Sequence, residues 1–174
     1  MKEFVNPKPD VMRQILHDDG QFPNSGLFLL IYKQAFLFEC TASEIEETFA
    51  RNNWTNSWRN GIFDYHHYHS TTHEVMGVYE GSASVQFGGP GGIVVTLQKG
   101  DVIVIPAGVA HKCMNADDYF KCVGAYPDGK DYDILKGKSA ERPAADENIN
   151  NVPLPDVDPV YGSEGPVMIN WEIQ

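Results

Sequence analysis

The sequence of 174 residues lacks several features that would point to other classes of protein. Its longest apolar run, residues 27–32, has six residues, whereas a membrane-spanning helix needs about 20. No secretory signal is visible near the N-terminus. Cysteine is scarce, with three residues, which argues against a disulfide framework. We therefore expect a cytoplasmic protein with free thiols and no membrane partner.

Basic residues are also few. The chain has 13 lysines and arginines against 24 aspartates and glutamates, which gives a formal net charge of −11. An acidic chain repels phosphate backbones, so we expect no nucleic-acid partner. Hydrophobic residues make up 42% of the sequence, which is enough to bury a core. The length suits one domain over residues 1–174.

Short strand-like segments fill the middle of the chain. They are separated by turn residues, many of them glycine, and lie at 61–69, 74–79, 84–87, 93–97, 102–105 and 120–125. Many short strands at this spacing predict an all-β sandwich or barrel. We assign residues 56–127 to the core of this barrel.

The flanking segments have different patterns. Residues 1–55 are predicted to form an N-terminal extension with a covered strand at 27–32 and one helix, because Thr41 and Glu44 have the spacing of a capping box. Residues 128–174 are acidic, and five of the 11 prolines lie between Pro143 and Pro166, which predicts an extended arm without a helix. Alternating apolar residues predict that this arm ends in a strand: Val167, Ile169, Trp171 and Ile173.

Histidine is concentrated directly before Glu74, where residues 66–73 hold four of the six histidines. Side chains two apart on a strand share a face, so His67 and His69 project together and His66 points away. A turn then brings Glu74 back on the next strand, and His111 arrives from a third. Three imidazoles and one carboxylate suit a divalent transition metal better than Ca²⁺ or Mg²⁺.

The spacing around these residues resembles two motifs of the cupin superfamily. The first, G-x5-H-x-H-x3,4-E-x6-G, is matched by Gly61, His67, His69, Glu74 and Gly81, and the second, G-x5-P-x-G-x2-H-x3-N, by Gly100, Pro106, Gly108, His111 and Asn115. Chance matches at so many fixed positions are negligible. Further stretches, including 65–70, 124–129 and 158–162, look like the YjlB-like bacterial cupins. The resemblance implies a jelly-roll β-barrel (a double-stranded β-helix) that holds one metal ion, and it implies no established reaction.

Side chains that share a face with the ligands predict the surrounding pocket. They are Phe63, Tyr65, Met76, Val78 and Cys113. Tyr65 and Cys113 carry a hydroxyl and a thiol and are the candidate catalytic groups. The plain alternative for each of these five residues is a place in the barrel core.

Two further residues near the motif have basic side chains, Arg59 and His73. Arg59 is the one upstream cation with the parity to reach a substrate, and His73 is predicted to face away from Glu74. The sequence does not choose among Fe, Mn, Ni, Zn, Co and Cu, because all bind such donors and availability in the cell decides.

Four protein ligands on an octahedral ion leave two positions for water, a bidentate substrate, or a substrate with O₂. We expect a metal-dependent, dioxygenase-like oxidoreductase that acts on a small, partly apolar molecule. The alternatives are a metal-dependent isomerase or epimerase and a non-catalytic small-molecule-binding module. The shortage of inward cations argues against a sugar-phosphate isomerase. Edge strands and terminal arms predict a homodimer.

Overall fold

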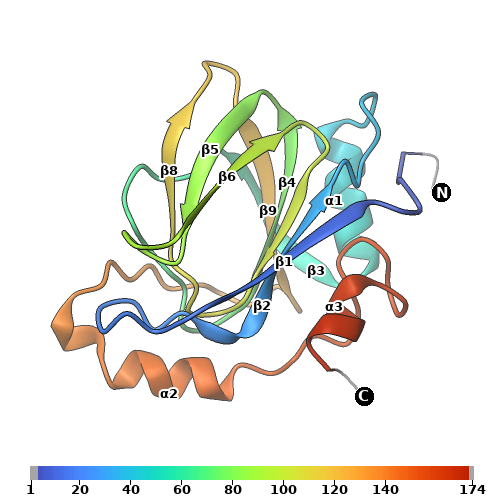
Figure 1. Cartoon of the computed structure of the whole chain (residues 1–174). Coiled ribbons are helices and arrows are strands. Elements are labelled where there is room, and N and C mark those ends of the chain that lie inside the picture. Colours follow the sequence, from blue (N-terminus) through green and yellow to red (C-terminus); the bar gives the residue numbers. More distant parts are fainter. Residues whose placement is uncertain (1–3, 173–174) are drawn as a thin grey trace.

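Two antiparallel β-sheets pack against each other in the computed structural model, which describes residues 4–172 (Figure 1). The larger sheet has the strand order β1-β2-β7-β4-β9-β3, and the smaller has β6-β5-β8. The strands are β1 (Asp10–Leu16), β2 (Ser25–Lys33), β3 (Trp54–Asn60), β4 (Glu74–Glu80), β5 (Ser82–Phe87), β6 (Ile93–Gln98), β7 (Val102–Ile105), β8 (His111–Ala116) and β9 (Lys121–Pro127). The predicted all-β fold is confirmed.

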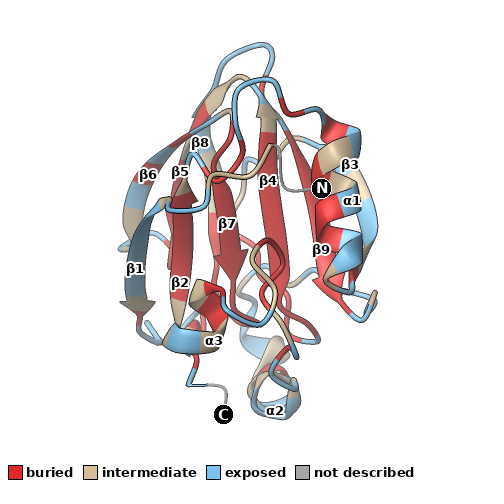
Figure 2. Cartoon of the chain, turned by 90° about the vertical axis from the view of Figure 1, so that its right-hand side faces the viewer, coloured by how far each residue is buried: buried red, intermediate tan, exposed pale blue. Residues whose placement is uncertain are grey.

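The larger sheet is covered on both faces, and strand alternation divides its side chains between two cores. On β2, Leu29 and Ile31 belong to the core between the two sheets. Leu30 and Tyr32 belong to a second core, which includes side chains of the flanking helices. Strands β7, β4 and β9 are therefore buried along most of their length, and β2 is buried at residues 29–32 (Figure 2). This explains the continuous apolar run of residues 27–32, since both faces of the strand need apolar side chains.

Helix α1 (Ala42–Arg51) covers the outer face of the larger sheet, as its capping pattern predicts. The Thr41 hydroxyl accepts from the Glu44 N–H, and the Glu44 carboxylate accepts from the Thr41 N–H. Ile45 and Phe49 are buried against the sheet. Gly77 of β4 permits this packing, because a Cβ there would lie 2.8 Å from Ile45 Cγ2. Within the described residues, no helix is long and apolar enough to cross a membrane.

Two predictions about strands need correction. Residues 61–69 do not form a regular strand, because β3 ends at Asn60 and the chain continues as a loop with isolated bridges at His67 and Tyr68. The alternation of side chains between two faces, which holds only for a strand, therefore does not apply to residues 61–69. Strand β1 was not predicted, since it lies at the sheet edge and its residues 10–14 are exposed, without an apolar face.

The C-terminal segment is not a helix-free arm ending in a strand, and that prediction is wrong. It contains a 3-10 turn (Ser139–Glu141) and the helices α2 (Ala144–Asn151) and α3 (Pro166–Asn170). Val167 and Trp171 are buried one helical turn apart, whereas Ile169 between them is 71% exposed. The spacing of the same apolar residues is therefore also compatible with a helix, and Pro166 lies in its first turn. Ile173 lies outside the described residues.

A buried carboxylate fastens this segment to the larger sheet. Asp158 is fully buried and accepts hydrogen bonds from the Tyr32 hydroxyl at 2.5 Å and from three backbone N–H groups. These amides belong to Val160, Tyr161 and Val167. One side chain thus joins β2, the 158–161 turn and the start of α3.

We predict that Asp158→Ala lowers the free energy of unfolding by about 2–4 kcal/mol, because it leaves buried donors without an acceptor. Chemical denaturation measures the change. Asp156→Ala is the matched control, since this nearby aspartate is exposed and makes no hydrogen bond through its carboxylate in the described structure. Equal stability of the two variants would contradict the assigned role.

Candidate metal centre

Three histidine side chains converge between the sheets. His67, His69 and His111 are buried, and each offers a ring nitrogen within 4.8 Å of the others. His67 and His111 exchange two backbone hydrogen bonds, of 3.2 and 2.9 Å. The Gly108 N–H donates to the His69 carbonyl at 2.8 Å. Backbone pairing therefore joins the 61–73 loop to the start of β8 and brings the three rings together without a regular strand at 61–69.

Hydrogen bonds to carbonyl groups fix which nitrogen each ring presents. The Nδ1 atoms of the three rings face backbone carbonyls, His67 at 3.1 Å, His69 at 2.5 Å and His111 at 3.1 Å. Because a carbonyl only accepts, each Nδ1 carries a proton and donates it. The Nε2 atoms remain as the donors for an ion, which is the arrangement expected of metal-binding histidines.

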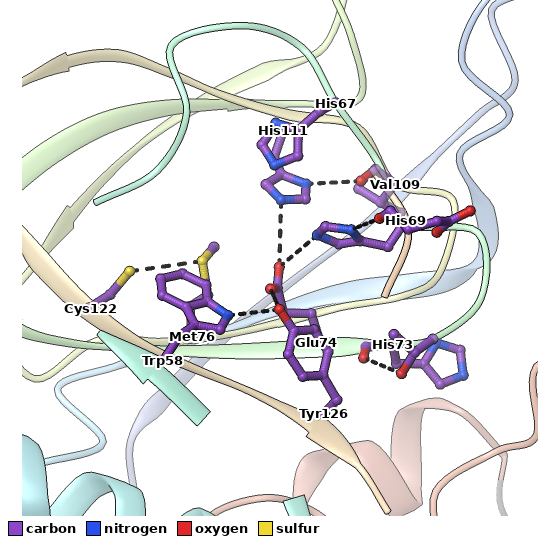
Figure 3. A network of polar contacts seen from close by, with 12 residues as sticks. Trp58, His67, His69, His73, Glu74, Met76, Val109, His111, Cys122 and Tyr126 are labelled. Atoms are coloured by element: carbon purple, nitrogen blue, oxygen red, sulfur yellow. Dashed lines mark hydrogen bonds and ion pairs between the residues drawn. The ribbon is translucent and has the colours of Figure 1, made fainter. Parts of the chain in front are cut away.

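The carboxylate of Glu74 completes the donor set. Its Oε1 lies 3.4 Å from His69 Nε2 and 3.6 Å from His111 Nε2 (Figure 3). Bonds to a divalent transition metal are about 2.0–2.2 Å long, so two of its ligand atoms are at most about 4.4 Å apart. Both separations fall within that limit, and the residues present fit such an ion.

Charge within this cluster is balanced internally. Burial lowers the pKa of the His67 imidazole to about 3. Burial alone would raise the pKa of Glu74, but His69 and His111 outweigh it and hold the pKa of the carboxyl well below its usual range. Burial would lower the pKa of His69, yet the Glu74 charge raises it above its ordinary value. A cation bound here would replace a proton as the partner of Glu74.

A cavity of about 280 Å³ opens beside the cluster. Its lining residues are Trp58, Arg59, Asn60, Gly61, Ile62, Phe63, His67, His69, Glu74, Met76, His111, Tyr126 and Tyr132. The two predicted pocket residues among them are Phe63 and Met76.

The other three predicted pocket residues are not among those that line this cavity, although the Tyr65 ring meets the His67 ring edge-on at 5.6 Å between centroids. Val78 is buried in the core between the sheets, and Cys113 packs at the edge of the same core. The Tyr65 ring stacks on Phe63 at 5.0 Å between ring centroids, with the Lys136 ammonium 4.7 Å from the Tyr65 ring centroid. The structure therefore gives neither candidate catalytic group, Tyr65 or Cys113, a place on the cavity wall.

Aromatic residues from other segments form much of the wall and were missed. Trp58 comes from β3, Tyr126 from β9, and Tyr132 from the segment that follows β9. The Tyr126 and Tyr132 rings stack at 4.8 Å, and the Tyr132 ring meets His69 edge-on at 5.3 Å. No fixed spacing links these residues to the histidine motif. The one available signal was the 124–129 stretch, which carries Tyr126.

The segment after β9 also supports a ligand directly. The carbonyl of Asp133 accepts from His69 Nδ1, and its carboxylate accepts from the Ser70 N–H at 2.7 Å and from the Ser70 hydroxyl. One residue thus holds both the ring of His69 and the backbone that follows it. The C-terminal segment is in this way part of the candidate metal centre.

His73 lies on the other side of β4 from the ligands. It is buried, its Nδ1 accepts from the Ala107 N–H at 2.9 Å, and its ring lies 4.8 Å from Trp171. Burial lowers the pKa of this imidazole to about 4, so the ring is neutral near pH 7. It packs between the sheet and the C-terminal segment.

The fold and the site together define a small β protein with a buried three-histidine cluster. A family model described as Cupin matches residues 55–133. Over 154 residues the chain is 42% identical to "Uncharacterized protein YjlB" of Bacillus subtilis (strain 168), which covers 88% of this chain and 92% of that protein. The chain therefore belongs to the cupin family, as its motifs predict. Its similarity to the Bacillus subtilis protein confirms the expected YjlB-like resemblance.

Solved structures match parts of this chain at low identity and low TM-score. Acireductone dioxygenase from Bacillus anthracis with cadmium ion in active center matches 48% of this chain and 57% of its own length, with 21% identity and a TM-score of 0.37. An uncharacterized conserved protein with a double-stranded beta-helix domain from Klebsiella pneumoniae matches 79% of this chain and 94% of its own, with 15% identity and a TM-score of 0.37. Similarities of this size say nothing about what this chain does.

We predict that Asp133→Ala weakens divalent metal binding by less than about 10-fold, because it removes the carboxylate that holds Ser70 next to His69 but keeps the backbone carbonyl that binds the His69 ring. Titration of the metal-free protein with Zn²⁺ against a chromophoric chelator measures the effect. Asp131→Ala removes the same charge from a neighbouring exposed position and is the control. Unchanged affinity in Asp133→Ala would mean that the Asp133 carboxylate does not support the site.

Proposed function

We propose that the protein is a metal-dependent, dioxygenase-like oxidoreductase that acts on a small, partly apolar molecule. The residues that would hold one divalent transition metal ion are His67, His69, Glu74 and His111. The observation that carries the proposal is the cavity that opens directly onto the donor atoms of these residues. A bound ion would supply Lewis-acid polarisation of a substrate oxygen and, if it is iron, activation of O₂.

The size and walls of the cavity support a small substrate with an apolar part. A volume of about 280 Å³ lies at the lower end of the range for ligand sites. Ile62, Phe63 and Met76 provide apolar surface, and the Trp58 and Tyr132 rings add flat faces. Such walls exclude water around a bound molecule and hold its apolar part by burial.

The pairing of Arg59 with other side chains supports an uncharged substrate over a phosphorylated one. Arg59 lines the cavity, but its guanidinium forms an ion pair with Glu46, and its Nη2 donates to the Ser43 hydroxyl at 3.1 Å. Lysine does not occur among the described residues that line the cavity. A phosphate clamp needs unpaired basic side chains, so a sugar-phosphate isomerase is the weaker proposal.

We predict that the iron-loaded protein consumes O₂ with at least one member of a panel of small, uncharged, partly apolar substrates, and that His111→Ala abolishes both metal binding and uptake. An oxygen electrode and elemental analysis measure the two quantities. His17→Ala is the control, because this histidine is exposed and outside the cluster.

Other outcomes would support other functions. Anaerobic turnover of an isomerase substrate, with no O₂ uptake on any member of the panel, would make the protein an isomerase or epimerase. Thermal stabilisation by a small molecule without any turnover would make it a binding module. Either result would overturn the oxidoreductase proposal while leaving the metal site in place.

A homodimer is a further part of the proposal. Strand β1 lies at the edge of the larger sheet, and Val11 and Met12 on it are exposed. An open edge with apolar side chains favours pairing with a second chain. We predict a mass in solution of twice the 19.4-kDa chain, measured by light scattering. A monomer at micromolar concentration would refute the dimer.

A further inference from the structure

The two oxygens of Glu74 have different partners. Oε1 faces the Nε2 atoms of His69 and His111. Oε2 accepts a hydrogen bond of 2.8 Å from the Tyr126 hydroxyl, and this hydroxyl in turn accepts one of 2.7 Å from Trp58 Nε1. Figure 3 shows the indole, the phenol and the carboxylate in sequence, on the side of Glu74 away from the histidines.

These two hydrogen bonds can run in one direction only, from Trp58 through Tyr126 to Glu74. An indole nitrogen only donates, and an ionised carboxylate only accepts. Because Trp58 donates to the Tyr126 oxygen, the phenol proton has to point to Glu74 Oε2. A carboxylate that binds a cation is deprotonated, so Glu74 Oε2 accepts from the Tyr126 hydroxyl 2.8 Å away. The Tyr126 hydroxyl therefore donates its proton to the hydrogen bond with Oε2.

The backbone explains how the indole reaches the phenol. Strand β3 pairs with β9, and Trp58 lies opposite Gly124 in this register. A Cβ at Gly124 would lie 2.1 Å from Trp58 Cε2, so the indole occupies the space that any other residue would fill. Glycine at this position lets the Trp58 ring lie against β9, two residues from Tyr126.

Packing holds the phenol in place as well. Tyr126 is buried, and its ring stacks on Tyr132 with an angle of 21° between the planes. Strand β9 also pairs with β4, with Ala125 opposite Val75, which places Tyr126 and Glu74 one position further along the same ladder. The neighbouring strands β4, β9 and β3 thus place the Glu74, Tyr126 and Trp58 side chains next to one another.

We infer that Tyr126 is a positioning residue that makes Glu74 a one-oxygen ligand, with Trp58 orienting its hydroxyl. The bond to Oε2 keeps this oxygen turned from the histidines, so that Oε1 alone is presented to an ion. The inference rests on the metal site of the proposed function. It does not depend on which reaction the ion supports.

The test compares Tyr126→Phe with the unmodified full chain. This variant keeps the ring and its stacking but removes the bond to Oε2. We expect Co²⁺ and Zn²⁺ to bind about 10–100-fold more weakly. We also expect the visible absorption spectrum of the Co²⁺ form to change, because Oε2 becomes free to bind the ion as a second donor. Trp58→Phe is expected to shift both readouts in the same direction by a smaller amount.

Tyr119→Phe is the matched control, because Tyr119 is 67% exposed, does not line the cavity, and its hydroxyl makes no hydrogen bond within the described residues. Its metal affinity and Co²⁺ spectrum should equal those of the unmodified chain. Thermal unfolding of each metal-free variant measures any loss of stability separately. A lower melting temperature in Tyr126→Phe with unchanged affinity and spectrum would assign Tyr126 a purely structural role and overturn the inference. An unmodified chain that binds neither ion would overturn the metal site itself, and the inference with it.

Discussion

The site depends on one buried carboxylate. Glu74 is 2% exposed, and an unpaired charge at such a position would cost several kcal/mol. The paired imidazoles of His69 and His111 offset this cost on one oxygen, and the Tyr126 hydroxyl offsets it on the other. The charge of Glu74 therefore explains why so many polar groups from distant parts of the chain meet between two apolar sheets.

The histidines are held by backbone carbonyls rather than by other side chains. This places the tautomer of each ring under the control of the fold. Two of these carbonyls, of Tyr65 and Val109, lie two residues before the ring that they bind, so local chain geometry suffices. The third belongs to Asp133, 64 residues after His69, and ties the centre to the C-terminal segment.

The difference between local and long-range contacts explains which features of the protein the sequence predicts. The four candidate ligand positions follow from the motif spacing, and the helix that begins after Thr41 follows from its local capping pattern. The pocket does not follow, because its walls are built by contacts between β3, β9 and the segment carrying Tyr132. The parity rule does not apply to Tyr65, because residues 61–69 are not a regular strand. On β4 the rule holds: Val78 shares a face with Glu74 and Met76 and is buried between the sheets, beyond the cavity. Alternation at Val167 and Trp171 suits a helix as well as a strand, and the burial that decides between them is tertiary.

The C-terminal segment then has a function in the site besides covering the sheet. It supplies the carbonyl that orients His69 and the ring that stacks on Tyr126, and it is itself anchored through Asp158 on the far side of the larger sheet. Loosening the segment would therefore disturb a ligand and the positioning residue of Glu74 together. Because a bound ion stabilises the conformation that binds it, metal binding should in turn stabilise the docked segment. An ion bound by these residues would therefore link the chain beyond the barrel thermodynamically to the histidine cluster.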